Sequence, residues 1–346
     1  PSSAASDVYK RQIKASIPGS GSLLGVFRLQ DHVLAKTPNL LLIEFAVNDT
    51  GVKPEQIERA MEGIVRQTWK HDPTTDIAFV YTIQEVMLKD LSAGKLPPSI
   101  VAMEKVAEHY GVPTIFLGKD VVAKVGAGEL VMKGDAKASE KPVFSPDGIH
   151  PHGAGFKLYM DAVERSLPTC FTAGTPGPHT LPAAPLHANN FENAKLVPIQ
   201  QSMLTGGWQL LDADHELVKQ YGETMPQIWR ANGPGDAMTV KFTGTTLGVY
   251  DITGPDSGQI VVSIDGGTPR TIDRFSHWGN AYQRRWVMLA QDLPYGEHTV
   301  TVTINSKLLD KAAILATRKV TIDDPQRYEG LRWHAGALML VGELSR

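Results

Sequence analysis

Short apolar runs alternate with helical patterns over the first half of the chain. The run LLLIEFAV (40–47) is apolar apart from Glu44, which predicts a strand covered on both faces. DIAFVYTI (76–83) and VPTIFLG (112–118) predict two further strands. The spacing of apolar residues predicts three helices, one from Pro54 onwards, one over 98–110 that ends at Gly111, and one over 155–167. This alternation predicts an α/β fold with a parallel sheet covered by helices.

The second half of the chain has a different pattern. Short β-rich runs such as GQIVVSIDGGTPRTI and EHTVTVTI are separated by Gly, Pro and Asp turns, and Asp265-Gly266 is a hairpin signal. Regular short strands of this kind predict an antiparallel β-sandwich or jelly roll. The stretch 172–190 carries four prolines, and its apolar residues follow neither the helical nor the strand period. This is typical of a semi-rigid linker.

These changes in pattern divide the chain into segments. PSSAASDVYKRQ (1–12) has no periodicity, and its DVYKRQ resembles translated sequencing-adapter sequence, so we interpret it as an adapter-derived or cloning scar. The remaining segments are an α/β domain over 13–169, truncated at its N-terminus, a Pro-rich linker over 170–190 and a β-sandwich domain over 191–346.

Composition excludes several classes of protein. The net charge of −3 gives no basic surface for a nucleic acid. No apolar run reaches the roughly 18 residues that a membrane span needs. Cys170 is the only cysteine, which excludes an intramolecular disulfide and a Cys-based zinc site, and its best interpretation is a small apolar filler.

Three segments could carry chemistry together: ASIPGSGS (15–22), FAVND (45–49) and SPDGIHP (145–151). Each has an ordinary interpretation when taken alone. A Gly/Ser turn is common, Asn-Asp after a strand is often the N-cap of the next helix, and Asp-x-x-His is often a surface turn. His150-Pro151-His152 suggests a metal pair, but no acidic or cysteine ligand is grouped with it, so we expect neither a metal nor a cofactor.

The order and context of these segments resemble the SGNH (GDSL) hydrolase superfamily over residues 13 to 169. The resemblance implies a flavodoxin-like three-layer fold and a serine esterase. It implies that Asp147 and His150 are the catalytic acid and base. It also implies that Asn48 and the backbone N–H of Gly19 form the oxyanion hole, with Gly21 as the alternative glycine.

One part of the family pattern is missing. The strand that ends in Gly-Asp-Ser should precede ASIPGSGS, and no Gly-Asp-Ser occurs there. We interpret four other serines as turn residues rather than replacements for the nucleophile: Ser16, Ser20, Ser22 and Ser145. In the family's sheet the absent strand would lie beside residues 40–47. We therefore expect the chain as written to be unstable and to lack esterase activity.

The β-rich half resembles jelly-roll domains attached to bacterial carbohydrate esterases of this superfamily, over roughly 190 to 346. Trp278 lies in the polar stretch RFSHWGNAYQRR and is a candidate for stacking on a sugar. The resemblance implies removal of acetyl or similar small acyl groups from an oligo- or polysaccharide. A secreted or periplasmic location would follow only from that substrate class. The alternatives are a non-catalytic glycan-binding protein and a lipase-like or thioesterase-like acylhydrolase.

Overall fold

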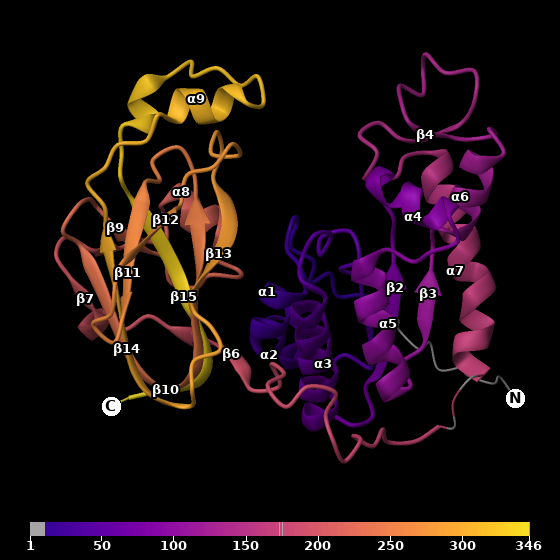
Figure 1. Ribbon diagram of the computed structural model, residues 1–346, viewed down its shortest axis with the longest axis horizontal. Coiled ribbons are helices and arrows are strands. Elements are labelled where there is room, and N and C mark those ends of the chain that lie inside the picture. Colours follow the sequence, from indigo (N-terminus) through magenta and orange to yellow (C-terminus); the bar gives the residue numbers. More distant parts are fainter. Residues whose placement is uncertain (1–10, 173, 175, 346) are drawn as a thin grey trace, which may run out of the picture. The chain divides into compact units, whose positions relative to one another are not determined.

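The computed structural model of the protein describes residues 11–172, 174 and 176–345 (Figure 1). The interpreted scar at 1–12 lies outside the described residues apart from Arg11 and Gln12. The chain forms two compact units. The α/β unit comprises the described residues up to Gly21, together with Leu29–Pro54 and Thr68–Pro182. The β unit comprises Ser22–Arg28, Glu55–Gln67 and Ala183 to the end of the described chain.

The α/β unit is built on parallel strands. β1 (Leu40–Ile43), β2 (Asp76–Tyr81) and β3 (Thr114–Phe116) form one parallel sheet in that order. β4 (Val131–Lys133) and β5 (Val143–Ser145) form a separate parallel pair. All three strands predicted from the sequence are present, although each is shorter than its apolar run.

The prediction of a strand over 40–47 with both faces covered was wrong. β1 ends at Ile43, because the Glu44 carboxylate accepts hydrogen bonds from the N–H of Ala46 at 3.0 Å and the hydroxyl of Thr82 at 2.7 Å, and turns follow. Leu40 and Leu42 are 46% and 58% exposed, whereas Ile43 is buried. In the part of the chain that the structure describes, β1 pairs only with β2. It is an edge strand, and one of its faces is open to solvent.

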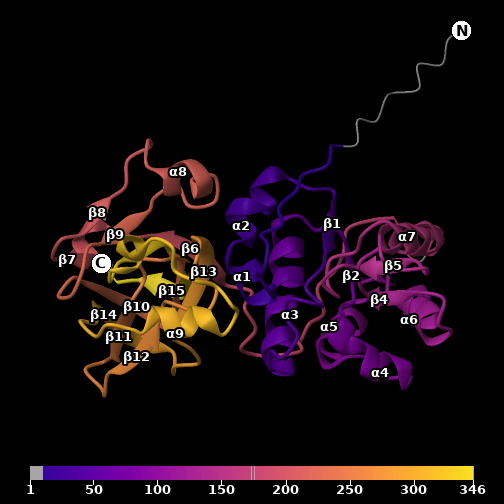
Figure 2. The same ribbon diagram turned by 90° about the horizontal axis from the view of Figure 1, so that it is seen from above.

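Helices cover the strands of the α/β unit. α5 (Pro98–Tyr110) and α7 (Ala154–Thr172) lie on opposite sides of β2 and β3 (Figures 1 and 2). The predicted C-cap is confirmed, since Gly111 has φ +66°. α7 continues past the predicted end at Leu167 and includes Pro168. The other helices with residues in this unit are α2 (Leu29–His32), α3 (Pro54–His71), α4 (Leu88–Ser92) and α6 (Lys119–Gly126).

α3 begins at Pro54 as predicted, and its residues are divided between the units, with Glu55–Gln67 belonging to the β unit. Among the described helices, none is both long enough and apolar enough to cross a membrane.

The Pro-rich stretch has no helix or strand in its described residues between α7 and β6 (Ala194–Pro198). Its first part lies on the α/β unit, where the His179 N–H donates to the Pro73 carbonyl at 2.7 Å and the His179 ring stacks on Trp69 with centroids 4.6 Å apart. Its second part belongs to the β unit, where the His187 N–H donates to the Glu62 carboxylate at 2.8 Å. Hydrogen bonds therefore hold both parts of this stretch in place.

The β unit is an antiparallel structure with a buried apolar core. Its longest strands, β10 (Ala237–Thr253) and β15 (Trp333–Leu344), pair with each other and with most of the remaining strands. The hairpin at Asp265-Gly266 is confirmed, with φ of +51° and +69°. The further elements are β7 (Leu204–Thr205), β8 (Gln209–Leu210), β9 (Trp229–Ala231), β11 (Gln259–Ile264), β12 (Arg270–Asp273), β13 (Gln283–Ala290), β14 (Gly296–Ile304), α1 (Ser22–Phe27), α8 (Glu216–Tyr221) and α9 (Lys311–Ala316).

Candidate active site

The loop after β5 joins an acid to a base. His150 Nδ1 donates to Asp147 Oδ2 at 2.7 Å. The His150 side chain is 80% exposed and that of Asp147 is 49% exposed. With Nδ1 engaged by the carboxylate, Nε2 is the nitrogen that remains to exchange a proton with another group.

The second oxygen of Asp147 is held by the loop itself. Asp147 Oδ1 accepts hydrogen bonds from the backbone N–H groups of Ile149 and His150, both at 2.9 Å. The hydrogen bonds from the His150 ring and from the His150 N–H hold the pKa of Asp147 well below its usual value. The carboxylate is therefore charged at any pH at which the imidazole would work as a base.

Ser145 is a turn residue, as its sequence context predicts. Its buried Oγ accepts hydrogen bonds from the N–H groups of Asp147, Gly148 and Ile149 at 3.2, 2.9 and 3.1 Å. The same hydroxyl donates to Asp147 Oδ1 at 2.8 Å. These bonds use the proton and the lone pairs of Oγ, so Ser145 shapes the loop and cannot also attack a substrate.

The two candidate oxyanion segments lie against each other. An ideal Cβ built on Gly21 would lie 2.1 Å from Asp49 Oδ1 and 3.9 Å from the Asn48 carbonyl oxygen. A side chain at residue 21 would therefore displace the buried Asp49 carboxylate, so glycine suits this close contact between the segment 19–21 and the turn after β1. Gly19 has φ +69°, a conformation that favours glycine. Ser20 is buried and donates to the Ile17 carbonyl at 2.7 Å, which makes it a turn residue as predicted.

Asn48 lies at the tip of its turn. The Asp49 N–H donates to the Phe45 carbonyl at 2.9 Å, and the Thr50 N–H donates to the Val47 carbonyl at 3.2 Å. Asn48 itself is exposed. Within the described residues its side-chain amide makes no hydrogen bond, which leaves the amide available as a donor.

A segment that the sequence did not indicate connects these loops. Gln84 and Glu85 follow β2, and the Gln84 side chain donates to Thr50 Oγ1 at 2.7 Å. The Glu85 N–H donates to the Gly148 carbonyl at 2.8 Å. The turn with Asn48 and the loop with His150 are thus tied to consecutive residues. Asn48 follows β1, Asp147 and His150 follow β5, and Gly21 packs against the turn that carries Asn48.

Trp278 lies in the β unit, between β12 and β13. It is 44% exposed, and the guanidinium carbon of Arg318 lies 3.3 Å from its ring centroid. One face of the indole is therefore covered, and a sugar could stack only on the other face.

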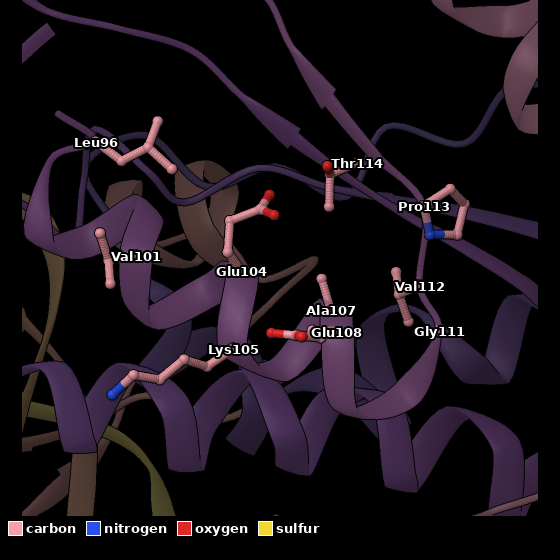
Figure 3. Close-up of a pocket in the computed structure, with 10 residues that line it drawn as sticks. All are labelled: Leu96, Val101, Glu104, Lys105, Ala107, Glu108, Gly111, Val112, Pro113 and Thr114. Carbon is pink, nitrogen blue, oxygen red and sulfur yellow. The ribbon is translucent and has the colours of Figure 1, made fainter. Parts of the chain in front are cut away.

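A separate hollow of about 610 Å³ lies at the amino end of β3, where Thr114 begins the strand (Figure 3). Its lining combines apolar and charged residues: Leu96, Val101, Glu104, Lys105, Ala107, Glu108, Gly111, Val112, Pro113 and Thr114. Because Gln84 and Glu85 follow the opposite end of the neighbouring strand β2, this hollow is distinct from the dyad loop.

The architecture is an α/β domain followed by a β-sandwich, and it is shared with solved two-domain structures. Two crystal structures of a two-domain esterase active on acetylated mannans are similar to this chain, one of them co-crystallised with mannopentaose. They have TM-scores of 0.71 and 0.69 with 18% sequence identity, and they cover 96% and 95% of this chain and 81% and 79% of their own chains. The predicted fold class is confirmed by this likeness. No family model matches the sequence, and no curated protein matches it either.

Proposed function

We propose that the α/β unit carries the acid–base and oxyanion parts of a serine-type carboxylic ester hydrolase that acts on an acylated carbohydrate. The observation that carries this proposal is the 2.7 Å hydrogen bond between His150 Nδ1 and Asp147 Oδ2 on an exposed loop. An exposed imidazole that is oriented by a charged carboxylate is suited to move a proton.

His150 is the general base and then the general acid. Nε2 takes the proton of the attacking hydroxyl and later gives it to the leaving alcohol of the sugar. Asp147 holds the ring in the tautomer that leaves Nε2 free and stabilises the imidazolium that forms. Its low pKa supports this role, because the carboxylate keeps its charge throughout.

Gly19 and Asn48 are the proposed oxyanion donors. A carbonyl that becomes tetrahedral gains negative charge on its oxygen, and fixed N–H donors stabilise that charge. Removing one such donor in comparable enzymes costs about 2.7–4 kcal/mol. The amide of Asn48 is available as a donor, and the tight packing of Gly21 on Asp49 supports a fixed approach of the two segments in this chain.

The acyl group proposed is acetyl or another small acyl group, and the proposed substrate is an acetylated mannan or a related glycan. The similarity to the mannan esterase structures supports this choice. The exposed half of Trp278 is a proposed contact for a sugar on the β unit.

The proposal is tested with the 346-residue chain and with a chain extended before Ile13 by a strand that ends in Gly-Asp-Ser. We expect the extended chain to release acetate from acetylated mannan or xylan, and His150→Ala to lower that rate at least about 10³-fold. We expect the 346-residue chain to leave p-nitrophenyl acetate unhydrolysed.

Each other outcome has a distinct meaning. Turnover by the 346-residue chain that is lost in His150→Ala would show that another of its groups is the nucleophile. A preference for long-chain esters would favour a lipase-like or thioesterase-like acylhydrolase. Glycan binding without any turnover by the extended chain would favour a non-catalytic glycan-binding protein.

A further inference from the structure

Two large aliphatic side chains are exposed beside the dyad loop. Val86 is 67% exposed and Ile149 is 39% exposed. Ile149 directly precedes His150, and Val86 directly follows Glu85, whose N–H bonds to the loop. Single exposed apolar residues are common on proteins, so their position must be considered before a role is assigned.

The backbone holds these two residues close together. The Glu85 N–H donates to the Gly148 carbonyl at 2.8 Å, one residue before Val86 in one segment and one residue before Ile149 in the other. A Cβ on Gly148 would lie 2.8 Å from Glu85 Oε2 and 3.0 Å from Glu85 Cβ, and Gly148 has φ +81°. Glycine at residue 148 is therefore what lets the two segments approach.

Neighbouring hydrogen bonds fix both segments. The Ile149 N–H donates to Asp147 Oδ1 at 2.9 Å and to Ser145 Oγ at 3.1 Å. On the other side of Val86, the Met87 N–H donates to the Gln84 carbonyl at 3.0 Å, and Met87 is buried. Val and Ile are also stiff at χ1 because they are branched at Cβ. Their exposure belongs to an ordered surface, and little rotamer freedom would be lost when a ligand covers it.

We propose that Val86 and Ile149 form an apolar platform for the C–H face of a sugar ring next to the ester, which makes them specificity-determining residues. This inference rests on the proposed function and names a subsite of the same site. A pyranose ring has a flat face of C–H groups and a rim of hydroxyls. It can cover two aliphatic side chains while its hydroxyls stay in water, so apolar area is buried without stranding polar groups. Val86 is widely exposed, and a sugar ring would cover more of its surface than the single methyl of an acetyl group would.

The platform is tested by binding, which needs no turnover. Mannopentaose is titrated into the 346-residue chain and into Val86→Asn and Ile149→Asn, and calorimetry gives the Kd. We expect each variant to raise the Kd about 5- to 10-fold, and Ile149→Val to stay within about twofold of the unchanged chain. The matched control is Val101→Asn, since Val101 is also an exposed valine of the α/β unit at 40% and lines the separate hollow. This control should bind like the unchanged chain.

Methyl NMR gives a second readout that does not depend on a substitution. The Val86 and Ile149 methyl signals should shift on addition of mannopentaose, whereas those of Val101 should not.

The possible outcomes separate the platform from the proposed function. If the unchanged chain binds mannopentaose and both Asn variants bind it equally well, the platform proposal is wrong and the proposed function stands. If the unchanged chain does not bind mannopentaose, the proposed mannan substrate fails and the platform fails with it. If the variants weaken only the binding of an octanoate ester, the surface holds an acyl chain, and the sugar platform is wrong.

Discussion

The Ser145 hydroxyl donates to Asp147 Oδ1 at 2.8 Å while it accepts the N–H groups of Gly148 and Ile149. The acid of the dyad is therefore held by a buried residue two positions earlier in the same loop. Hydrogen bonds from within the loop fix the orientation of the Asp147 carboxylate, so no residue from a distant segment is needed for this. This explains how a side chain that is half exposed can keep the geometry that His150 requires.

Replacement of Ser145 by Ala should destabilise the α/β unit by about 1–3 kcal/mol, because the N–H groups of Asp147 and Gly148 lose their acceptor, whereas the Ile149 N–H keeps Asp147 Oδ1. Chemical denaturation measures this change. The matched control is Ser139→Ala, because the Ser139 hydroxyl donates to the Lys141 carbonyl at 2.8 Å in an exposed turn. The control should lower the free energy of unfolding by less than about 0.5 kcal/mol. An equal loss of stability in the two variants would contradict the role given to Ser145.

The pKa of Asp147 should depend on His150. Because the folded pKa is depressed, ionised Asp147 stabilises the fold above its unfolded pKa near 3.8, and this contribution is lost as the pH falls below 3.8 through the folded pKa. A carbon-13 NMR titration of the Asp147 carboxyl should give a midpoint below 3.8. In His150→Ala the midpoint should rise part of the way towards 3.8, since the hydrogen bond from the ring is the largest cause and is lost, whereas the backbone N–H of residue 150 remains.

Asp72 is the internal control for this titration. Its pKa is also lowered, but mainly by hydrogen bonds from the side chain and the backbone of Thr74. The midpoint of Asp72 should therefore not change in His150→Ala. A parallel rise of both midpoints would mean that the substitution disturbs the whole unit rather than the dyad.

Gly21→Ala should destabilise the α/β unit by about 1–3 kcal/mol, because its new methyl would lie 2.1 Å from the buried Asp49 Oδ1 and must displace it. The control is Gly126→Ala on α6, where a Cβ would meet nothing within 4 Å. This change should be neutral or stabilising by up to about 1 kcal/mol, since Ala favours a helix more than Gly does. The two thermal denaturation curves give the comparison. A Gly21→Ala protein as stable as the unchanged chain would show that the two turns are not in close contact.

The parts of the structure that sequence could predict are those with local causes. The C-cap at Gly111 needs only a glycine after an amphipathic run, and φ +66° is the conformation that such a cap adopts. Asp147 and His150 are three residues apart in a turn, so their contact is also a local event. Periodicity, caps and a short acid–base spacing were therefore sufficient for α5 and for the dyad.

The parts that sequence could not predict depend on neighbours from distant segments. The exposure of Leu40 and Leu42 depends on what lies beside β1, and an apolar run carries no information about that. The link between Glu85 and Gly148 uses a backbone N–H and a backbone carbonyl, which every residue except proline can offer. No residue type marks such a contact in advance, so the segment after β2 gave no sequence signal.

The last prediction concerns the β unit, where β10 and β15 are joined through a buried charge. Asp251 is fully buried and accepts two hydrogen bonds from Arg274, at 2.7 and 2.9 Å, and one from Trp333 Nε1 at 2.8 Å. Asp251→Asn would leave the Arg274 guanidinium buried without its counter-charge, so we expect a loss of about 3–5 kcal/mol. The control is Asp214→Asn, because the Asp214 side chain is 97% exposed and its pairing with Lys219 at 3.3 Å should contribute less than about 1 kcal/mol. Urea denaturation followed by tryptophan fluorescence measures both variants, since Trp333 lies against the buried carboxylate. If Asp251→Asn lowers the free energy of unfolding no more than the control does, a neutral amide serves Arg274 and Trp333 as well as the carboxylate. The charge of Asp251 would then not stabilise the β unit.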